Sequence, residues 1–83
     1  MTMTLYDLMN NITLQGHIEV QLFDESGEEK ESRFYEHCED LSGMELPDGW
    51  EDKEVSYIYP QKFTRKHWTW AEESSCLIIE IKE

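Results

Sequence analysis

Apolar residues near the N-terminus recur at the spacing of an α-helix. Four of them would form one face of such a helix: Leu5, Leu8, Met9 and Ile12. Thr4 is the expected N-cap, and Asp7 places a carboxylate beside the exposed amides of the first turn. Gly16 is expected to end the helix. A helix of about ten residues is marginal alone, so it should pack against another element.

Alternation of apolar and polar residues then predicts a β-hairpin. His17–Asp24 alternates as a strand with one buried face does. Asp24–Lys30 is polar and centred on Gly27, which predicts a hairpin turn. The chain should return as a second strand over Glu31–Cys38, where aromatic residues stand between charged ones.

An irregular loop is predicted over Glu39–Lys53, because glycine and proline interrupt any regular pattern there. Three apolar residues of this loop are expected to pack against the core: Met44, Leu46 and Trp50.

The last third of the chain predicts further strands. Glu54–Tyr59 is expected to be a strand that Pro60 ends, and Ser75–Lys82 is expected to be another. His67–Trp70 would add a short strand or one side of a hairpin. We therefore expect residues 1–83 to form a single α+β domain. A short N-terminal helix would pack on an antiparallel sheet of about four strands, in two layers.

Composition narrows the possible functions. The chain has 83 residues and a net charge of −12, and 39% of its residues are hydrophobic, which is enough for a packed core. So negative a chain would be repelled by phosphates, which disfavours direct binding to nucleic acid or to an anionic membrane. The chain shows no signal peptide and no apolar run of about 18 residues, so a cytoplasmic location is expected.

The negative charge is concentrated in one part of the chain. Glu19–Glu54 holds 14 acidic and 3 basic residues. A solvated surface is the simpler reading of this region. The alternative is a surface that binds a basic protein partner, made of these side chains: Asp24, Glu25, Glu28, Glu29, Glu31, Glu36, Glu39 and Asp40.

The stretch Pro60–Trp70 is basic instead, with three basic and no acidic residues. Cations between aromatic residues can bind nucleic acid, but three of them are few against the charge of the whole domain. We expect Trp68 or Trp70 to cap the core, and the cations to pair with acids of this chain or of a second copy. A homo-oligomer formed through this stretch is therefore an alternative.

Candidate catalytic and metal-binding residues form no recognisable site. Cys38 follows His37 directly, but neighbouring strand residues point to opposite faces, and the nearby acids would raise the pKa of the thiol. The zinc-competent side chains lack the spacing of a zinc motif: His17, His37, Cys38, His67 and Cys76. We therefore expect no catalytic residue, no metal and no cofactor.

The order of several short segments resembles a known group of proteins. These segments are T-L-Y-D-L-M at residues 4–9, Phe23-Asp24 before a turn, Leu46-Pro47, Trp50–Val55 and an apolar C-terminal strand. They resemble small acidic proteins carried by phages and conjugative elements of Gram-positive gut bacteria, although Lys62–Trp70 departs from that pattern. The resemblance implies an inhibitor of host defence, such as an anti-CRISPR or antirestriction protein.

The charge pattern predicts a non-enzymatic protein-interaction module, and one form of it would mimic nucleic acid and inhibit a host defence or DNA-binding protein. The resemblance implies that such a module belongs to a mobile element. Two alternatives remain open at this stage. One is a small thiol- or metal-dependent enzyme, and the other is a self-assembling structural module.

Overall fold

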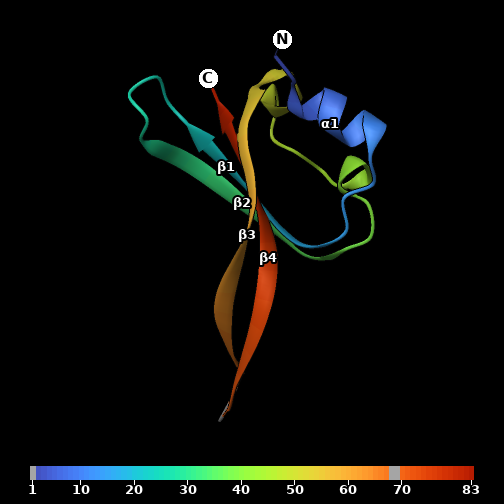
Figure 1. Cartoon of the computed structure of the whole chain (residues 1–83), viewed down its shortest axis with the longest axis vertical. Coiled ribbons are helices and arrows are strands. Elements are labelled where there is room, and N and C mark those ends of the chain that lie inside the picture. The colour runs from blue at the N-terminus through green and yellow to red at the C-terminus, as the bar shows by residue number, and fades with distance from the viewer. Residues whose placement is uncertain (1, 68–69) are drawn as a thin grey trace.

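One N-terminal helix and a four-stranded sheet make up the fold (Figure 1). The computed structural model describes residues 2–67 and 70–83, and the side chains of residues 2–62 and 75–83. The elements are α1 (Leu5–Asn11), β1 (Gly16–Phe23), β2 (Glu29–Cys38), the 3₁₀ helices η1 (Leu41–Gly43) and η2 (Trp50–Asp52), β3 (Glu54–His67) and β4 (Trp70–Lys82). The predicted α+β class is confirmed.

The sheet is mixed, with the strand order β2-β1-β4-β3. β1 is antiparallel to β2 and parallel to β4, and β3 is antiparallel to β4. The central pair therefore differs from the wholly antiparallel sheet expected from the sequence. The connection between β2 and β3 carries the chain from one edge of the sheet to the other. The apolar second half of β4, residues 77–81, lies between β3 and β1 and pairs with both.

Helix α1 starts as predicted but ends early. The Thr4 hydroxyl accepts from the Asp7 amide at 3.1 Å, and the Asp7 carboxylate accepts from the Thr4 amide at 3.2 Å, which closes a capping box. The helix ends at Asn11, so Ile12 leaves the helical face and is 51% exposed. Gly16 begins β1 instead of ending the helix. No helix in the described part of the chain is long and apolar enough to span a membrane.

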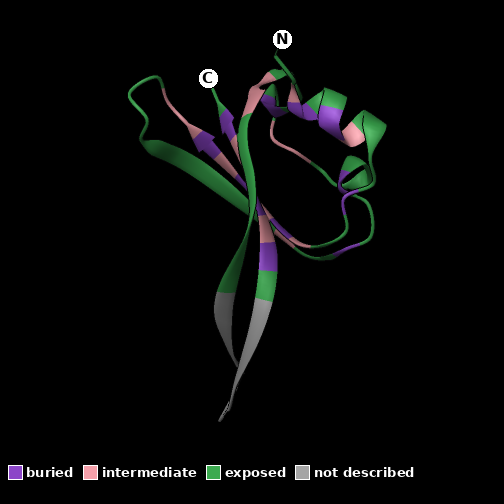
Figure 2. Cartoon of the chain, in the orientation of Figure 1, coloured by how far each residue is buried: buried purple, intermediate pink, exposed green. Residues whose placement is uncertain are grey.

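The hydrophobic core lies between one face of the sheet and a layer made of α1, the segment that follows α1 and the loop after β2 (Figure 2). The sheet contributes Ile18, Val20, Leu22, Ile79 and Ile81, and the other layer contributes Leu5, Leu8, Leu14, Leu41 and Trp50. Leu46 packs against this core as expected, and Trp50 is only 4% exposed. Met44 is 38% exposed, so its predicted place in the core is wrong.

Strand β3 passes through Pro60 and continues to His67, which corrects the predicted end at Tyr59. Because β3 lies at the edge of the sheet, a residue without an amide hydrogen is tolerated there. β4 likewise begins at Trp70, earlier than predicted. Before Leu77 it pairs with β3 but not with β1, so the two strands leave the sheet as a long ribbon (Figure 1).

Candidate functional site

The eight acidic residues predicted to bind a partner fall into two groups at the two ends of β2. The first group, which we call the acidic turn, lies at the β1–β2 connection and consists of Asp24, Glu25, Glu28, Glu29 and Glu31. The second group is Glu36, Glu39 and Asp40. At a strand rise of ~3.3 Å per residue, Glu31 and Glu36 stand about 16 Å apart along β2. The acids thus form two separate surfaces.

Asp24 holds the acidic turn in one conformation. Its Oδ1 accepts hydrogen bonds from the amide of Ser26 at 2.9 Å, the hydroxyl of Ser26 at 2.6 Å and the amide of Glu28 at 3.0 Å. The Asp24 amide donates to the Glu28 carbonyl at 2.9 Å, which closes the hairpin. Gly27 takes the left-handed conformation, with φ of 89°, that a three-residue hairpin loop of this kind requires. These contacts together fix the backbone conformation of the turn.

Lys30, in β2 beside the acidic turn, is paired with a carboxylate outside the turn. Lys30 Nζ lies 2.5 Å from Glu83 Oε1, at the C-terminal end of the sheet, and these two charges pair with each other. Arg33 is 3.9 Å from Glu31, which is a looser ion pair. Glu25, Glu28 and Glu29 are exposed. The tip of the turn therefore displays negative charge on a rigid support.

The hydrogen bonds to Asp24 predict a specific pH dependence. They lower the pKa of this carboxyl below its ordinary value of 3.8, chiefly through the Ser26 hydroxyl and then the Glu28 amide. A lowered folded-state pKa stabilises the protein above the ordinary value, and this contribution is lost as the pH falls through the folded-state pKa. The wild type should therefore be more stable than Asp24→Asn at neutral pH, and the difference should shrink in acid.

Urea unfolding followed by circular dichroism, at neutral pH and below pH 3.8, measures this difference. Glu25→Gln is the control, because it removes a neighbouring charge that makes no hydrogen bond within the turn. A difference between wild type and Asp24→Asn that stays constant with pH would contradict the assignment.

Two of the three residues in the second acidic group interact with neighbouring residues of the same chain. Asp40 caps η1, accepting from the Ser42 amide at 3.0 Å and from the Ser42 hydroxyl at 2.8 Å. Glu36 Oε1 is 3.6 Å from Nε2 of His37. Glu39 is exposed. This group is the weaker candidate for binding a partner.

A β-bulge near the end of β2 brings two histidines together. Gly16 pairs with Cys38 but Ile18 pairs with Tyr35, so β2 carries one residue more than β1 in this interval. His37 has a left-handed φ of 50°, and its ring centroid lies 4.5 Å from that of His17. The sequence carried no sign of this contact, because it depends on the bulge.

The two cysteines are buried and form no disulfide. Burial raises the pKa of the Cys38 thiol, and the charges of Asp40 and Glu39 add to this effect. Burial also raises the pKa of Cys76. His37 is exposed while Cys38 is buried, as expected for neighbours on opposite faces. Within the described residues, no group of three potential ligand side chains is placed to hold a metal ion.

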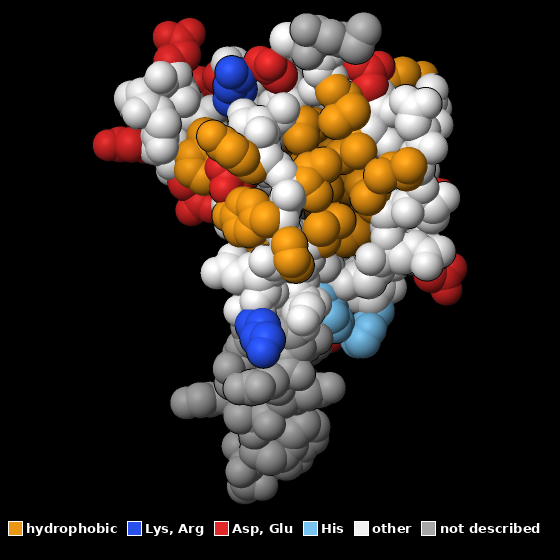
Figure 3. Space-filling model, viewed as in Figure 1, with side chains coloured by type: hydrophobic (Ala, Val, Ile, Leu, Met, Phe, Trp, Pro, Cys, Tyr) orange, Lys and Arg blue, Asp and Glu red, His pale blue; other side chains and the backbone are white. Residues whose placement is uncertain are grey.

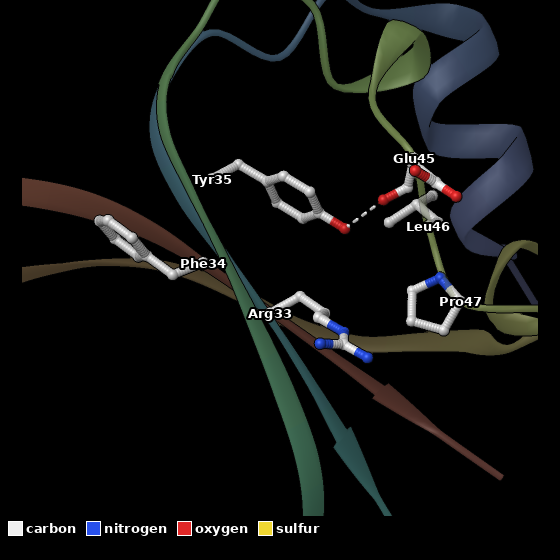
Figure 4. Close-up of a pocket in the computed structure, with 6 residues that line it drawn as sticks. All are labelled: Arg33, Phe34, Tyr35, Glu45, Leu46 and Pro47. Atoms are coloured by element: carbon white, nitrogen blue, oxygen red, sulfur yellow. Dashed lines mark hydrogen bonds between the residues drawn. The ribbon is translucent and has the colours of Figure 1, made fainter.

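A hollow of about 280 Å³ lies where β2 meets the loop that follows it (Figure 4). The phenol of Tyr35 crosses this hollow and donates to the carbonyl oxygen of Glu45 at 2.8 Å. Burial raises the pKa of Tyr35, so the hydroxyl keeps the proton that it donates. Arg33 and Pro47 also line the hollow. The contact fastens the loop to β2, and a sequence without known loop geometry could not show it.

The surface carries exposed hydrophobic side chains as well as acids (Figure 3). Tyr57, Ile58 and Tyr59 of β3 are 66%, 41% and 37% exposed. In the basic stretch, Pro60, Gln61 and Lys62 are exposed. The predicted roles of Trp68, Trp70 and the remaining cations fall outside the side chains that the structure describes.

No protein-family profile, curated protein or solved structure matches this chain. Evidence about its function therefore comes from its own residues, and the acidic turn is the candidate that the described geometry favours.

Proposed function

We propose that this protein is a non-enzymatic module that binds a basic surface of a partner protein through its acidic turn. The observation that carries the proposal is the network around Asp24, which holds the backbone of the turn in one hairpin conformation and so presents its exposed acidic residues together at the tip. A rigid surface loses little conformational entropy when it binds. Its negative field also attracts a basic partner and speeds their encounter.

The partner has a basic groove that normally holds nucleic acid. Carboxylates on the turn take the place of phosphates in such a groove, and the net charge of −12 disfavours nucleic acid itself as a ligand of this protein. In a mobile element, a module of this kind blocks a host defence or DNA-binding protein. The resemblance to small acidic proteins of phages and conjugative elements supports this setting.

The enzyme alternative has less support. Both thiols are buried and have raised pKa values, whereas a nucleophilic cysteine needs a lowered one. Where side chains are described, no polar or charged residue is buried. Self-association through Pro60–Trp70 stays a prediction.

Reversing the charge of the acidic turn should abolish capture of the partner. The variant Glu25→Lys/Glu28→Lys/Glu29→Lys replaces attraction by repulsion at the tip. We expect at least about a tenfold loss of captured partner at low salt, because the encounter is electrostatic. The measurement is affinity capture from a lysate of a Gram-positive gut bacterium, in which added duplex DNA should compete with the acidic turn for the groove of the partner.

The matched control reverses three exposed acids near η2, in Asp48→Lys/Glu51→Lys/Asp52→Lys. It has the same net charge as the turn variant, and it should retain capture. Equal losses of captured partner in the two variants would show that capture depends on the total charge of the protein, which would contradict binding through the acidic turn. Capture that persists in the turn variant and at high salt would overturn the proposed function.

A further inference from the structure

The face of the sheet opposite α1 carries no helix in the part of the chain that the structure describes (Figure 1). We call it the open face. Strand register places these side chains on it: Glu19, Gln21 and Phe23 of β1, Ile78, Glu80 and Lys82 of β4, and Tyr57 and Tyr59 of β3. Ile78 is buried at its centre, and both tyrosines are substantially exposed. The open face therefore presents aromatic and acidic side chains together.

A hollow of about 310 Å³ lies where the open face meets the acidic turn. The residues that line it include two aromatic, three acidic and one basic residue: Phe23, Tyr57, Asp24, Glu25, Glu80 and Lys82. This volume is at the lower end of the range for ligand pockets. The hollow suits a single long side chain better than a larger molecule.

The charges around the hollow favour a cation. Asp24 stays ionised because its hydrogen bonds lower its pKa. Glu80 accepts a hydrogen bond from Tyr59, which raises the pKa of Tyr59 and keeps that phenol neutral. The cation at the rim is already paired, since Lys82 Nζ is 3.2 Å from Glu54 Oε2. Negative charge therefore predominates in the hollow.

The aromatic side chains of Phe23 and Tyr57 favour a guanidinium group over an ammonium group. A guanidinium group is planar, stacks on aromatic faces and bonds carboxylates with two parallel N–H groups, whereas an ammonium group is a compact and strongly hydrated charge. We propose that the hollow receives an arginine side chain from an extended basic segment of the partner protein. This inference rests on the proposed function and adds the residue type that the partner inserts beside the acidic turn.

Binding of two capped peptides of equal charge tests the proposal. One alternates arginine with glycine, and the other alternates lysine with glycine. Titrated into the full-length protein and followed by amide chemical shifts, the arginine peptide should bind about three to ten times more tightly. The largest shifts should be those of Phe23, Tyr57 and Glu80. Equal affinities for the two peptides would overturn the proposal.

Two variants of the hollow sharpen the test. Tyr57 is 66% exposed, so Tyr57→Ser should fold normally, lose the preference for arginine and bind the lysine peptide unchanged. Glu80→Gln should also weaken the arginine peptide more than the lysine peptide. A preference that survives both substitutions would refute the assignment to this hollow.

The matched control is Glu28→Gln/Glu29→Gln, which neutralises acids of the turn outside the lining of the hollow. It should weaken both peptides equally and leave the preference intact. This separates the two proposals. Loss of the preference in this control would contradict the assignment to the hollow, whereas the proposed function fails if charge reversal of the acidic turn lowers partner capture no more than charge reversal near η2 does.

Discussion

Replacing Ile79 with alanine is expected to lower the free energy of unfolding by about 2–5 kcal/mol, the usual range for removing a buried isoleucine. Ile79 is fully buried in β4, and register places it between Val20 of β1 and Ile58 of β3. The substitution leaves a cavity in the middle of the sheet. A domain of this length has a total stability of about 5–10 kcal/mol. The variant should therefore lose a large share of its stability and unfold at a lower temperature than the wild type.

Urea unfolding followed by circular dichroism measures this loss. Ile58→Ala is the matched control, because Ile58 faces Ile79 across the β3–β4 ladder but is 41% exposed. It removes the same atoms from a position that is already partly solvated, so its cost should be well below that of Ile79→Ala. Equal losses at the two positions would contradict the burial that the structure assigns to them.

Trp50→Ala is expected to cost about 3–5 kcal/mol, since it removes the largest side chain of the core. Trp50 is 4% exposed and joins the loop after β2 to the core cluster that includes Leu5 and Leu8 of α1. A seven-residue helix has little stability of its own, so α1 depends on this packing. Hydrogen exchange should therefore show the amides of α1 losing protection along with global stability.

The control for this substitution is Tyr6→Ala, which removes an aromatic side chain from α1 itself. Tyr6 is 52% exposed, so the loss of stability should be small. If Tyr6→Ala destabilised the protein as much as Trp50→Ala, the helix would pack through a different face from the one described.

The core substitutions and the binding variants test different parts of the molecule. The acidic turn joins β1 to β2 and is held by its own hydrogen bonds, so exposed carboxylates there can be changed without touching the core. Ile79→Ala and Trp50→Ala report on the two layers of the fold. A loss of binding in a turn variant with unchanged stability therefore belongs to the surface.

Local patterns predicted the elements well. Four predicted features depend on residues close together in the sequence, and all four are present: the Thr4 cap, strand β1, the turn at Gly27 and the returning strand β2. The errors occur where distant residues decide. Pro60 does not end its strand, because β3 lies at the sheet edge, and the edge position depends on the whole topology.

For the candidate site, the sequence predicted which acidic residues take part but not how they are placed relative to one another. Eight acids were expected to act as one surface, but the length of β2 separates them, and Asp24 and Asp40 cap turns of their own chain. The two aromatic residues of the hollow were not singled out, because Phe23 and Tyr57 are far apart in sequence. Only the order of the strands brings both of them to the open face.

The sequence by itself determined the short helix, the hairpin, the α+β class and the concentration of negative charge around one turn. These properties follow from interactions between residues close along the chain and from counts of charge. Tertiary structure decided the parallel pairing of β1 with β4 and the hollow beside the acidic turn. These depend on which strands meet, and pairing between distant strands is set by how the whole core packs.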